Sequence, residues 1–389
     1  MNNIIVNMVV EPSYTASHWY GSFMQGVTES LKKKASLNII NYDRYNHNTG
    51  FSNAGIKTRN VLVTGTSSLW ISKMAASLNA AGIHPVIVCS QPPDSKSNMS
   101  YIAFNHSNAA FKMTKYLISL GKKHIAFFGM NPDSLADKLK YEGYCMALDE
   151  SGIKASQDDI YINNGCIHEC VTRLLGKIKK YDAILCTNDY VAIYLMNSQF
   201  PDGIIIPDNL YITGFGDTLT GRIFIPSLTT VTLDFYEAGK KAIDIYLYLE
   251  NNPQLKSLSA TVECHIIIRE STGNNRIPNM NNNTNIHILY DDTIIDAFYT
   301  DPDINEILVI EHLLQQCDKF DGFIIDELMK GVKYEDMAEH LNMSEKTIKY
   351  RLNKMLASCN KQSKNDLISF AQKYFHTGIG TRMSEAKPW

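Results

Sequence analysis

The sequence predicts an α/β protein with parallel sheets and flanking helices, followed by a small all-α domain. Three observations support this prediction. Short apolar runs alternate with amphipathic stretches from residue 4 to about residue 272, which is typical of βαβ units. A polar, Asn-rich stretch then interrupts the alternation. From residue 320 onward the apolar residues recur only at helical spacing.

Short apolar runs bounded by polar or turn residues are the candidate strands of the α/β region. They are Ile4–Val10, Leu37–Tyr42, Val61–Thr64, Val86–Cys89, Ile102–Phe104, His124–Phe128, Ile160–Ile162, Ala183–Cys186, Tyr211–Gly214 and Cys264–Ile268. Amphipathic stretches between them predict helices at Tyr20–Lys33, Ile71–Ala81, Asn108–Leu120 and Ala136–Ser151. Sheets of this kind bind ligands in the loops that follow their strands.

Length and composition limit the class of protein. The chain has 389 residues, of which 44% are hydrophobic and 20% charged, which excludes collagen and wholesale disorder and favours two or three domains. No stretch approaches the roughly 18 apolar residues of a membrane helix, so we expect no membrane contact. The N-terminus lacks the features of a signal peptide and the eight cysteines are irregularly spaced, so we expect a cytoplasmic protein.

Several motifs of the α/β region stand in the order of a known family. They are Leu117–Ala126, Lys140–Leu148, Asp182–Asp189, Gly214–Asp217, Pro226–Val231 and Ile268–Ser271. On these residues the region 1–272 resembles the ligand-binding core of the LacI/GalR family, which is similar to periplasmic sugar-binding proteins. The resemblance implies a two-lobe, periplasmic-binding-protein-like sensor domain. Lobe one would comprise about 1–103 and 233–257, and lobe two about 104–232 and 258–272, with crossovers near 103–105, 231–234 and 257–261.

The resemblance also implies a ligand site between the lobes. The expected ligand-binding residues are Tyr14, Ser17, Trp19, Asn105, Lys140, Asn188, Asp189 and Asp217. An aromatic ring suits the apolar face of a sugar, and the polar groups suit its hydroxyls. The family usually has Asp, Arg and Asp where this chain has Asn105, Lys140 and Gly216. We therefore do not expect the standard hexose pose.

Each of these positions also has a purely structural interpretation. Trp19 could pack against the core. Asn188 and Asp189 could cap a helix after a strand, since Asx residues favour that position, and Asp217 could do the same. Only their joint placement in loops after strands favours a ligand site.

Two connecting segments follow the α/β region. Residues 273–285 are Asn-rich, without periodicity, and read as a linker. Residues 286–319 form an acidic connecting segment in which Ile304–Gln316 has apolar residues at helical spacing. That helix could pack on the neighbouring domain or on a second subunit, and the sequence leaves both open.

Residues 320–376 predict four short helices. Gly331 would end the first, Tyr334–Leu341 is the second, Ser344 would cap the third, and Ser363 would begin the fourth. In the third helix the apolar residues face one side, and basic and amide residues the other. Two helices joined by a tight turn, the second exposing such side chains, are typical of a helix-turn-helix. We expect residues 377–389 to be a flexible tail.

The segment Gly331–Lys349 resembles the LuxR-type helix-turn-helix, with Ser344-Glu-Lys-Thr-Ile-Lys349 as its most specific part. The resemblance implies base contacts and backbone contacts with double-stranded DNA. The expected DNA-binding residues are Ser344, Lys346, Thr347, Lys349, Tyr350, Asn353 and Lys354. The alternative is a solvated basic helix in a module that binds a protein partner.

The net charge of −3 does not exclude DNA, because it is a cancellation. Residues 286–343 hold fourteen acids against three bases, a net −11, whereas residues 344–389 hold nine bases against three acids, a net +6. Cys166 and Cys170 invite a metal site, but no second ligand pair has zinc spacing, so we favour packing and expect no metal. No nucleophile motif or phosphate loop is present, so we expect neither an enzyme nor a cofactor.

The sequence therefore predicts a ligand-responsive transcriptional regulator. Its sensor would bind a small polar molecule, a sugar or sugar derivative, and its C-terminal helix-turn-helix would bind DNA as part of a homodimer. One alternative is a sugar-binding signalling or receptor protein whose helical domain binds a protein partner. Another is a solute-binding receptor for transport, which would require export.

Overall fold

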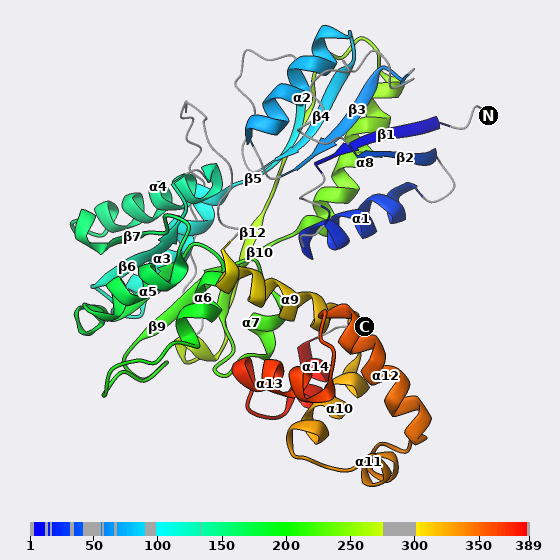
Figure 1. Ribbon diagram of the computed structural model, residues 1–389. Coiled ribbons are helices and arrows are strands. Elements are labelled where there is room, and N and C mark those ends of the chain that lie inside the picture. Colours follow the sequence, from blue (N-terminus) through cyan, green and yellow to red (C-terminus); the bar gives the residue numbers. More distant parts are fainter. Residues whose placement is uncertain are drawn as a thin grey trace.

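The computed structural model describes residues 4–11, 15, 18–31, 35–41, 56, 58–65, 68–89, 99–132, 134–274 and 301–386. The predicted ligand residues Tyr14 and Ser17 lie outside the described residues, as does most of the Asn-rich linker. Two α/β lobes and a group of helices at the C-terminal end make up the molecule (Figure 1).

Lobe one contains a six-stranded sheet in the order β11-β5-β4-β3-β1-β2, in which all neighbouring strands pair in parallel. The strands are β1 (Ile4–Val10), β2 (Ala35–Asn41), β3 (Asn60–Thr64), β4 (His84–Cys89), β5 (Ser100–Phe104) and β11 (Ser259–Val262). Its helices are α1 (His18–Leu31), α2 (Ser68–Ala80) and α8 (Phe235–Asn251). Glycines let α1 and α8 pack backbone against backbone, because a Cβ on Gly239 would lie 2.2 Å from the Phe23 carbonyl oxygen.

Lobe two contains a second six-stranded sheet, in the order β12-β10-β9-β8-β6-β7, whose edge strand β12 runs antiparallel to β10. The strands are β6 (Ile125–Met130), β7 (Ile160–Ile162), β8 (Ala183–Cys186), β9 (Tyr211–Phe215), β10 (Thr229–Leu233) and β12 (Cys264–Ile267). The helices are α3 (His106–Ser119), α4 (Leu135–Glu150), α5 (Ile167–Leu175), α6 (Asp189–Met196) and α7 (Leu219–Ile223).

Alternation along β6 builds two separate cores on the two faces of this sheet. Ile125 and Phe127 pack with α3 and α4, whereas Ala126 and Phe128 pack with α5 and α6. This follows from the period of two along a strand, which sends successive side chains to opposite faces. The parallel sheets with flanking helices confirm the predicted fold class.

The chain crosses between the lobes three times, and a capping residue stands at the first two crossings. Asn105 follows β5 and caps α3, and Asp234 follows β10 and caps α8. The third crossing falls at Glu263, between β11 and β12, and is later than the predicted 257–261. The reason is that β11 pairs with β5 and so belongs to lobe one. Strand β11 lies at the edge of the sheet. Its Ser- and Thr-containing sequence has no apolar run from which a strand could be predicted.

The helical domain, residues 301–386, begins with the helix that the acidic segment predicts. Its helices are α9 (Pro302–Gln316), α10 (Lys319–Met329), α11 (Tyr334–Leu341), α12 (Glu345–Ser358), α13 (Lys364–Tyr374) and α14 (Ile379–Ala386). The predicted end signals are confirmed. Gly331 and Asn342 have positive φ, the Ser344 hydroxyl accepts from the Thr347 N–H, and Ser363 forms a capping box with Asp366.

The prediction of a flexible tail at 377–389 is wrong for residues 379–386, which form α14. Ile379 and Met383 are buried one turn apart. The Asp326 carboxylate accepts hydrogen bonds from the N–H groups of Ile379 and Gly380 at 3.0 and 2.9 Å. The local sequence is a weak helix former, and contacts with α10 stabilise it instead. Gly322 of α10 and Gly380 cross so closely that a Cβ on Gly322 would lie 2.8 Å from the Gly380 Cα.

Lobe two and the helical domain share one continuous apolar core. It runs from the outer face of the lobe-two sheet through α5, α6 and α7 to the helices α9–α14. The buried stripe of α9 (Ile307, Ile310, Leu313 and Leu314) lies within it, and α9 lies between lobe two and the remaining helices (Figure 1). The sequence left two packing partners open for α9, and the structure places it on the neighbouring domain.

Candidate ligand site and nucleic-acid interface

The carboxyl end of β8 carries two of the predicted ligand residues. Asn188 caps α6, since its side-chain oxygen accepts from the Val191 N–H at 3.0 Å, so the structural interpretation of this residue is confirmed. Asp189 is fully buried. Its Oδ2 accepts from the N–H and the hydroxyl of Thr218 at 2.8 and 3.2 Å, and its Oδ1 accepts from the Thr230 hydroxyl at 2.5 Å. Burial raises the pKa of Asp189 to about 6.

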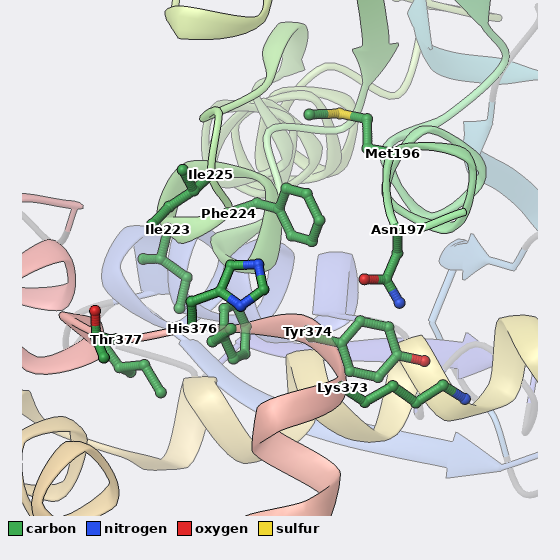
Figure 2. A pocket seen from close by; sticks show the side chains of 11 residues that line it. Met196, Asn197, Ile223, Phe224, Ile225, Lys373, Tyr374, His376 and Thr377 are labelled. Carbon is green, nitrogen blue, oxygen red and sulfur yellow. The ribbon is translucent and has the colours of Figure 1, made fainter. Parts of the chain in front are cut away.

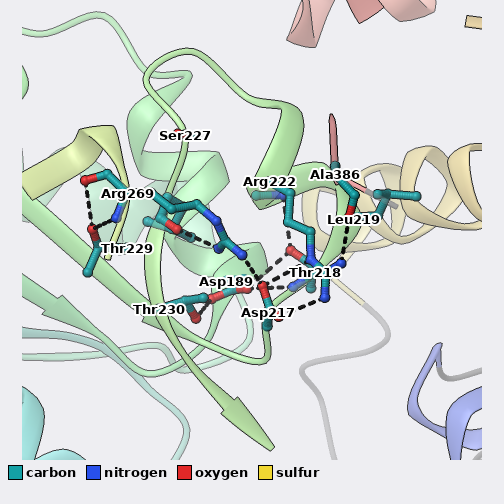
Figure 3. A network of polar contacts seen from close by, with 12 residues as sticks. Asp189, Asp217, Thr218, Leu219, Arg222, Ser227, Thr229, Thr230, Arg269 and Ala386 are labelled. Atoms are coloured by element: carbon teal, nitrogen blue, oxygen red, sulfur yellow. Dashed lines mark hydrogen bonds and ion pairs between the residues drawn. The ribbon is translucent and has the colours of Figure 1, made fainter. Parts of the chain in front are cut away.

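Asp217 lies in the loop after β9 and has the left-handed φ of +54°. Arg222 donates to both of its carboxylate oxygens, at 3.1 and 2.7 Å, and Arg269 donates at 2.5 Å (Figure 3). Arg222 also donates to the Ala386 carbonyl of α14 at 2.9 Å. Thr218, not Asp217, caps α7. The Asp217 carboxylate therefore joins the β9 loop to two arginines, one of which contacts the helical domain.

Lys140 of α4 is buried and joins the ends of two strands. Its ammonium donates to the Asp137 carboxylate at 3.0 Å and to the Thr187 carbonyl, just after β8, at 2.6 Å. Asp137 in turn accepts from the Asn131 N–H after β6, at 3.1 Å. The ammonium also lies 5.1 Å from the Phe215 ring centroid. Lys140 thus takes part in a buried network at the carboxyl ends of β6, β8 and β9.

Aromatic side chains from both lobes are in contact near the crossovers. Trp19 of α1 stacks on Phe235 with centroids 5.6 Å apart, and Phe235 contacts Phe104 at 4.6 Å. Trp19 also reaches Tyr190 of lobe two at 6.5 Å. The stacking on Phe235 therefore agrees with the interpretation that Trp19 packs against the core. Asn105 adjoins this group and holds its α3 cap through the Asn108 N–H at 3.0 Å.

His106 belongs to this region and has no distinctive sequence signal. Its side chain is 3% exposed, and neither ring nitrogen has a hydrogen-bond partner among the described residues. Burial, together with the Lys140 charge, lowers the pKa of His106 to about 3, so the ring is neutral. Its ring centroid lies 6.2 Å from that of Phe104. A buried neutral imidazole of this kind can accept or donate one hydrogen bond to a bound molecule.

Two pockets lie where lobe two meets the helical domain. One, of about 250 Å³, is drawn in Figure 2 and has Phe224 from lobe two and His376 from the helical domain in its lining. The other, of about 730 Å³, is lined by charged side chains. They are Asp217, Arg222, Arg269, Glu270, Arg382 and Glu385.

The third of the four predicted helices, α12, has one buried and one exposed face. Ile348, Leu352 and Met355 are buried. The opposite side, which we name the recognition face, consists of exposed side chains, and Tyr350 alone is 70% exposed. Its members are Lys346, Thr347, Lys349, Tyr350, Asn353 and Lys354. The structure thus brings these predicted DNA-binding residues together on one side, with Ser344 at the N-cap.

The basic side chains of α12 make two kinds of contact: some lie at the surface, and one joins α12 to α10. Lys349 forms an ion pair with Glu345 at 2.8 Å and lies 5.3 Å from the Tyr334 ring centroid, while Lys364 of α13 lies 5.5 Å from the same centroid. Arg351 instead pairs with Asp318 at 3.0 Å and with Asp321 of α10 at 2.8 Å. Lys349 and Lys364 thus lie at the exposed surface, with local partners, whereas Arg351 fixes α12 to α10.

Residues 114–272 match the family model described as a periplasmic binding protein-like domain. The HTH-type transcriptional regulator RegA of Clostridium saccharobutylicum is 28% identical over 199 residues, which cover 50% of this chain and 59% of RegA. The HTH-type transcriptional repressor PurR of Pasteurella multocida is 27% identical over 195 residues, which cover 48% of this chain and 57% of PurR. The chain thus spans less than two thirds of the length of these curated relatives.

A solved structure gives the same result for the fold. The complex of the transcriptional regulator CelR with cellobiose aligns with a TM-score of 0.60 at 18% identity, covering 70% of this chain and 86% of that chain. The two lobes have the periplasmic-binding-protein-like fold. The helical domain lies outside the family match, which ends at residue 272.

The described residues also limit other kinds of site. No helix among them is both long and apolar enough to span a membrane. Within the same ranges, no three His, Cys, Asp or Glu side chains are grouped so that they could hold a metal ion.

Proposed function

We propose that this protein is a ligand-responsive transcriptional regulator that acts as a homodimer in the cytoplasm. The periplasmic-binding-protein-like lobes bind a small polar effector, and the LuxR-type helix-turn-helix of the helical domain binds double-stranded DNA. The observation that carries this proposal is the recognition face of α12, on which exposed basic, amide and hydroxyl side chains gather. The curated relatives named above are transcriptional regulators and not enzymes, which supports a regulator without catalytic activity.

The chemistry of the recognition face suits the major groove. Lys349 offers a donor to guanine, Asn353 can form two hydrogen bonds with adenine, and Tyr350 can contact a thymine methyl. Lys346, Thr347 and Lys354 flank them and suit phosphate oxygens, which fix the register on the duplex. In a symmetric dimer two such helices would read half-sites about 10 base pairs apart.

A sugar or sugar derivative is the effector class that the lobes favour. Trp19 offers a flat aromatic surface at the contact between the lobes, and Asn105, Lys140 and Asn188 add polar groups nearby. The carboxylates of Asp189 and Asp217 already accept hydrogen bonds from other residues of lobe two. Any role that they have in ligand binding is therefore indirect, through the β9 loop that they stabilise. Tyr14 and Ser17 complete the proposed set from the sequence. The CelR structure was solved with cellobiose, which makes a sugar the first class to test.

The test is a fluorescence-anisotropy titration with duplex DNA taken from upstream of the protein's own coding sequence. Lys349→Ala should weaken specific binding by about 1–3 kcal/mol, the value of one good base contact. Lys241→Ala is the matched control, because Lys241 of lobe one has the same i,i+4 ion pair, with Glu237 at 3.3 Å, and its loss changes net charge equally. Equal affinity of the two variants would remove the recognition-face assignment. Capture of a protein partner without DNA binding would favour the signalling alternative.

A further inference from the structure

Two buried carboxylates share three consecutive backbone amides of lobe two. Asp189, the first residue of α6 after β8, accepts from the N–H of Thr218. Glu311, in the middle of α9, accepts from the N–H groups of Leu219 and Thr220 at 3.0 and 2.7 Å. The hydroxyls of Thr218 and Thr220 donate to the same two carboxylates. One short segment is thus held from the predicted ligand side and from the helical domain at once.

Both carboxylates are well buried, which makes these contacts strong. Asp189 is 0% exposed and Glu311 is 2% exposed. In surroundings of low dielectric constant, hydrogen bonds to a carboxylate are stronger than in water, and an unpartnered group is costly. A shift of residues 218–220 cannot therefore occur while Asp189, Glu311 and the rest of their helices stay in place.

Further hydrogen bonds attach the N-terminal end of α9 to lobe two. Asp301, the N-cap of α9, accepts from the Ile167 N–H of α5 at 2.7 Å. The Tyr194 hydroxyl of α6 donates to Asp303 at 2.9 Å. Helices α5, α6 and α7 are therefore all bonded to α9, and the helical domain moves with lobe two. Among these described contacts with α9, the one at residues 218–220 is also held on its other side by Asp189, which begins α6 just after β8.

We propose that residues 218–220, held between Asp189 and Glu311, transmit the effector state of the lobes to the DNA-binding helical domain, with Glu311 as the positioning residue. This inference rests on the proposed function. A ligand that moves the strand ends of lobe two displaces Asp189, and the three amides carry that displacement to α9. The coupling free energy between two sites is reciprocal, so a change at Glu311 should affect the contacts of Asp189 by the same free energy as the reverse.

The experiment is a double-mutant cycle that needs neither DNA nor effector. Amide hydrogen exchange is measured in the full chain for the wild type, Asp189→Asn, Glu311→Gln and the double variant. Asp189→Asn should raise exchange in α9 (residues 302–316) by about fivefold or more, the lower range of coupling between sites. In the Glu311→Gln background the same substitution should add nothing, because the link is already broken.

Controls separate this role from a purely structural one. Glu250→Gln removes a carboxylate that accepts from the Asn60 side chain at 2.8 Å in lobe one, and it should leave the effect of Asp189→Asn on α9 intact. If Glu311→Gln fails to fold, Thr220→Val removes only the hydroxyl donor at 2.7 Å and completes the same cycle. The proposal would be overturned if the effects of the two substitutions on hydrogen exchange in α9 were additive. It would also be overturned if Asp189→Asn left exchange in α9 unchanged. Failure to bind DNA would instead overturn the proposed function and leave the cycle interpretable.

Discussion

Glu311 and Thr220 stand ninety-one positions apart in the chain, yet the Glu311 carboxylate accepts the Thr220 N–H at 2.7 Å. The contact joins the acidic segment after the linker to a short helix of lobe two. Glu311→Ala would leave the amides of Leu219 and Thr220 without a partner in a buried place. Each such loss costs about 1–3 kcal/mol, so we expect the free energy of unfolding to fall by about 3 kcal/mol. Urea unfolding measures it, and Glu250→Ala at the half-buried lobe-one contact should cost less.

Asp189 gives a pH dependence with a defined sign. Burial raises its pKa to about 6 in the folded state, above the value of about 3.9 in an unfolded chain. The folded protein therefore binds the proton more tightly, so the contribution of this group to stability is fully present below pH 4. It is lost as the pH rises through 6.

Asp189→Asn cannot ionise, so the stability of the variant should lack that slope, and the difference in stability between variant and wild type should change with pH. Thermal unfolding from pH 4 to pH 7 is the measurement. The variant should lose stability relative to the wild type at pH 4 and recover part of it at pH 7. A constant difference over this range would show that Asp189 does not titrate in it.

The recognition face should show two kinds of variant. Lys346→Ala and Lys354→Ala should weaken binding to all duplexes alike and lower the salt slope by about one phosphate each. Asn353→Ala should leave the salt slope unchanged and relax preference at one base pair, at a cost of about 1–3 kcal/mol. Titrations at several salt concentrations on matched and mismatched duplexes distinguish these outcomes. Identical behaviour of all three variants would contradict the division into backbone and base contacts.

Replacing glycine with alanine should have opposite effects on stability at two positions: Gly322, where α10 crosses α14, and Gly21 of α1. Gly322→Ala places a Cβ 2.8 Å from the Gly380 Cα and should destabilise the helical domain by about 1–3 kcal/mol. Gly21→Ala is the control, because among the described residues no atom outside the adjacent backbone of α1 lies within 4 Å of the Cβ position of Gly21. That helix should gain up to about 1 kcal/mol. Thermal unfolding of both variants checks the prediction, and a stable Gly322→Ala would mean that the helices can separate.

Among the proposed ligand residues, Trp19 offers the clearest readout. A thermal-shift titration with cellobiose and with ribose tests the sugar class directly. A ligand at a hundred times its Kd stabilises the folded state by about 2.7 kcal/mol. Trp19→Ala should remove the shift that a bound sugar produces, whereas Trp70→Phe, in the core of lobe one, should keep it. A shift that survives Trp19→Ala would place the sugar elsewhere.

Local sequence was sufficient where one element determines its own structure. The apolar runs predicted β1, β7 and β8 with the bounds they have, and capping residues predicted the ends of α12 and α13. The Thr-rich strand β10 and the edge strand β11 were missed, because neither has an apolar run and both depend on pairing with a neighbour.

Contacts between distant segments could not be predicted in the same way. Arg351 lies on the same helix as the predicted DNA-binding lysines, yet its guanidinium is held by Asp321 of α10 and by the N-cap residue Asp318. The sequence left open whether α9 packs on the neighbouring domain or on a second subunit, and in the structure its Glu311 is buried against lobe two. In each case a partner far along the chain decides whether the charge faces water, and periodicity contains no information about that partner.

The exposure of Tyr350 and its neighbours on α12 has a consequence for how the protein would find its target. No part of the described lobes covers this face in the structure, so it would be accessible to a duplex. Scanning along the genome would then proceed at all times through weak phosphate contacts, by sliding and hopping. The effector would change how long the protein stays bound at its operator relative to random sites. It would thereby change the ratio between occupancy of the operator and occupancy of competing non-specific sites.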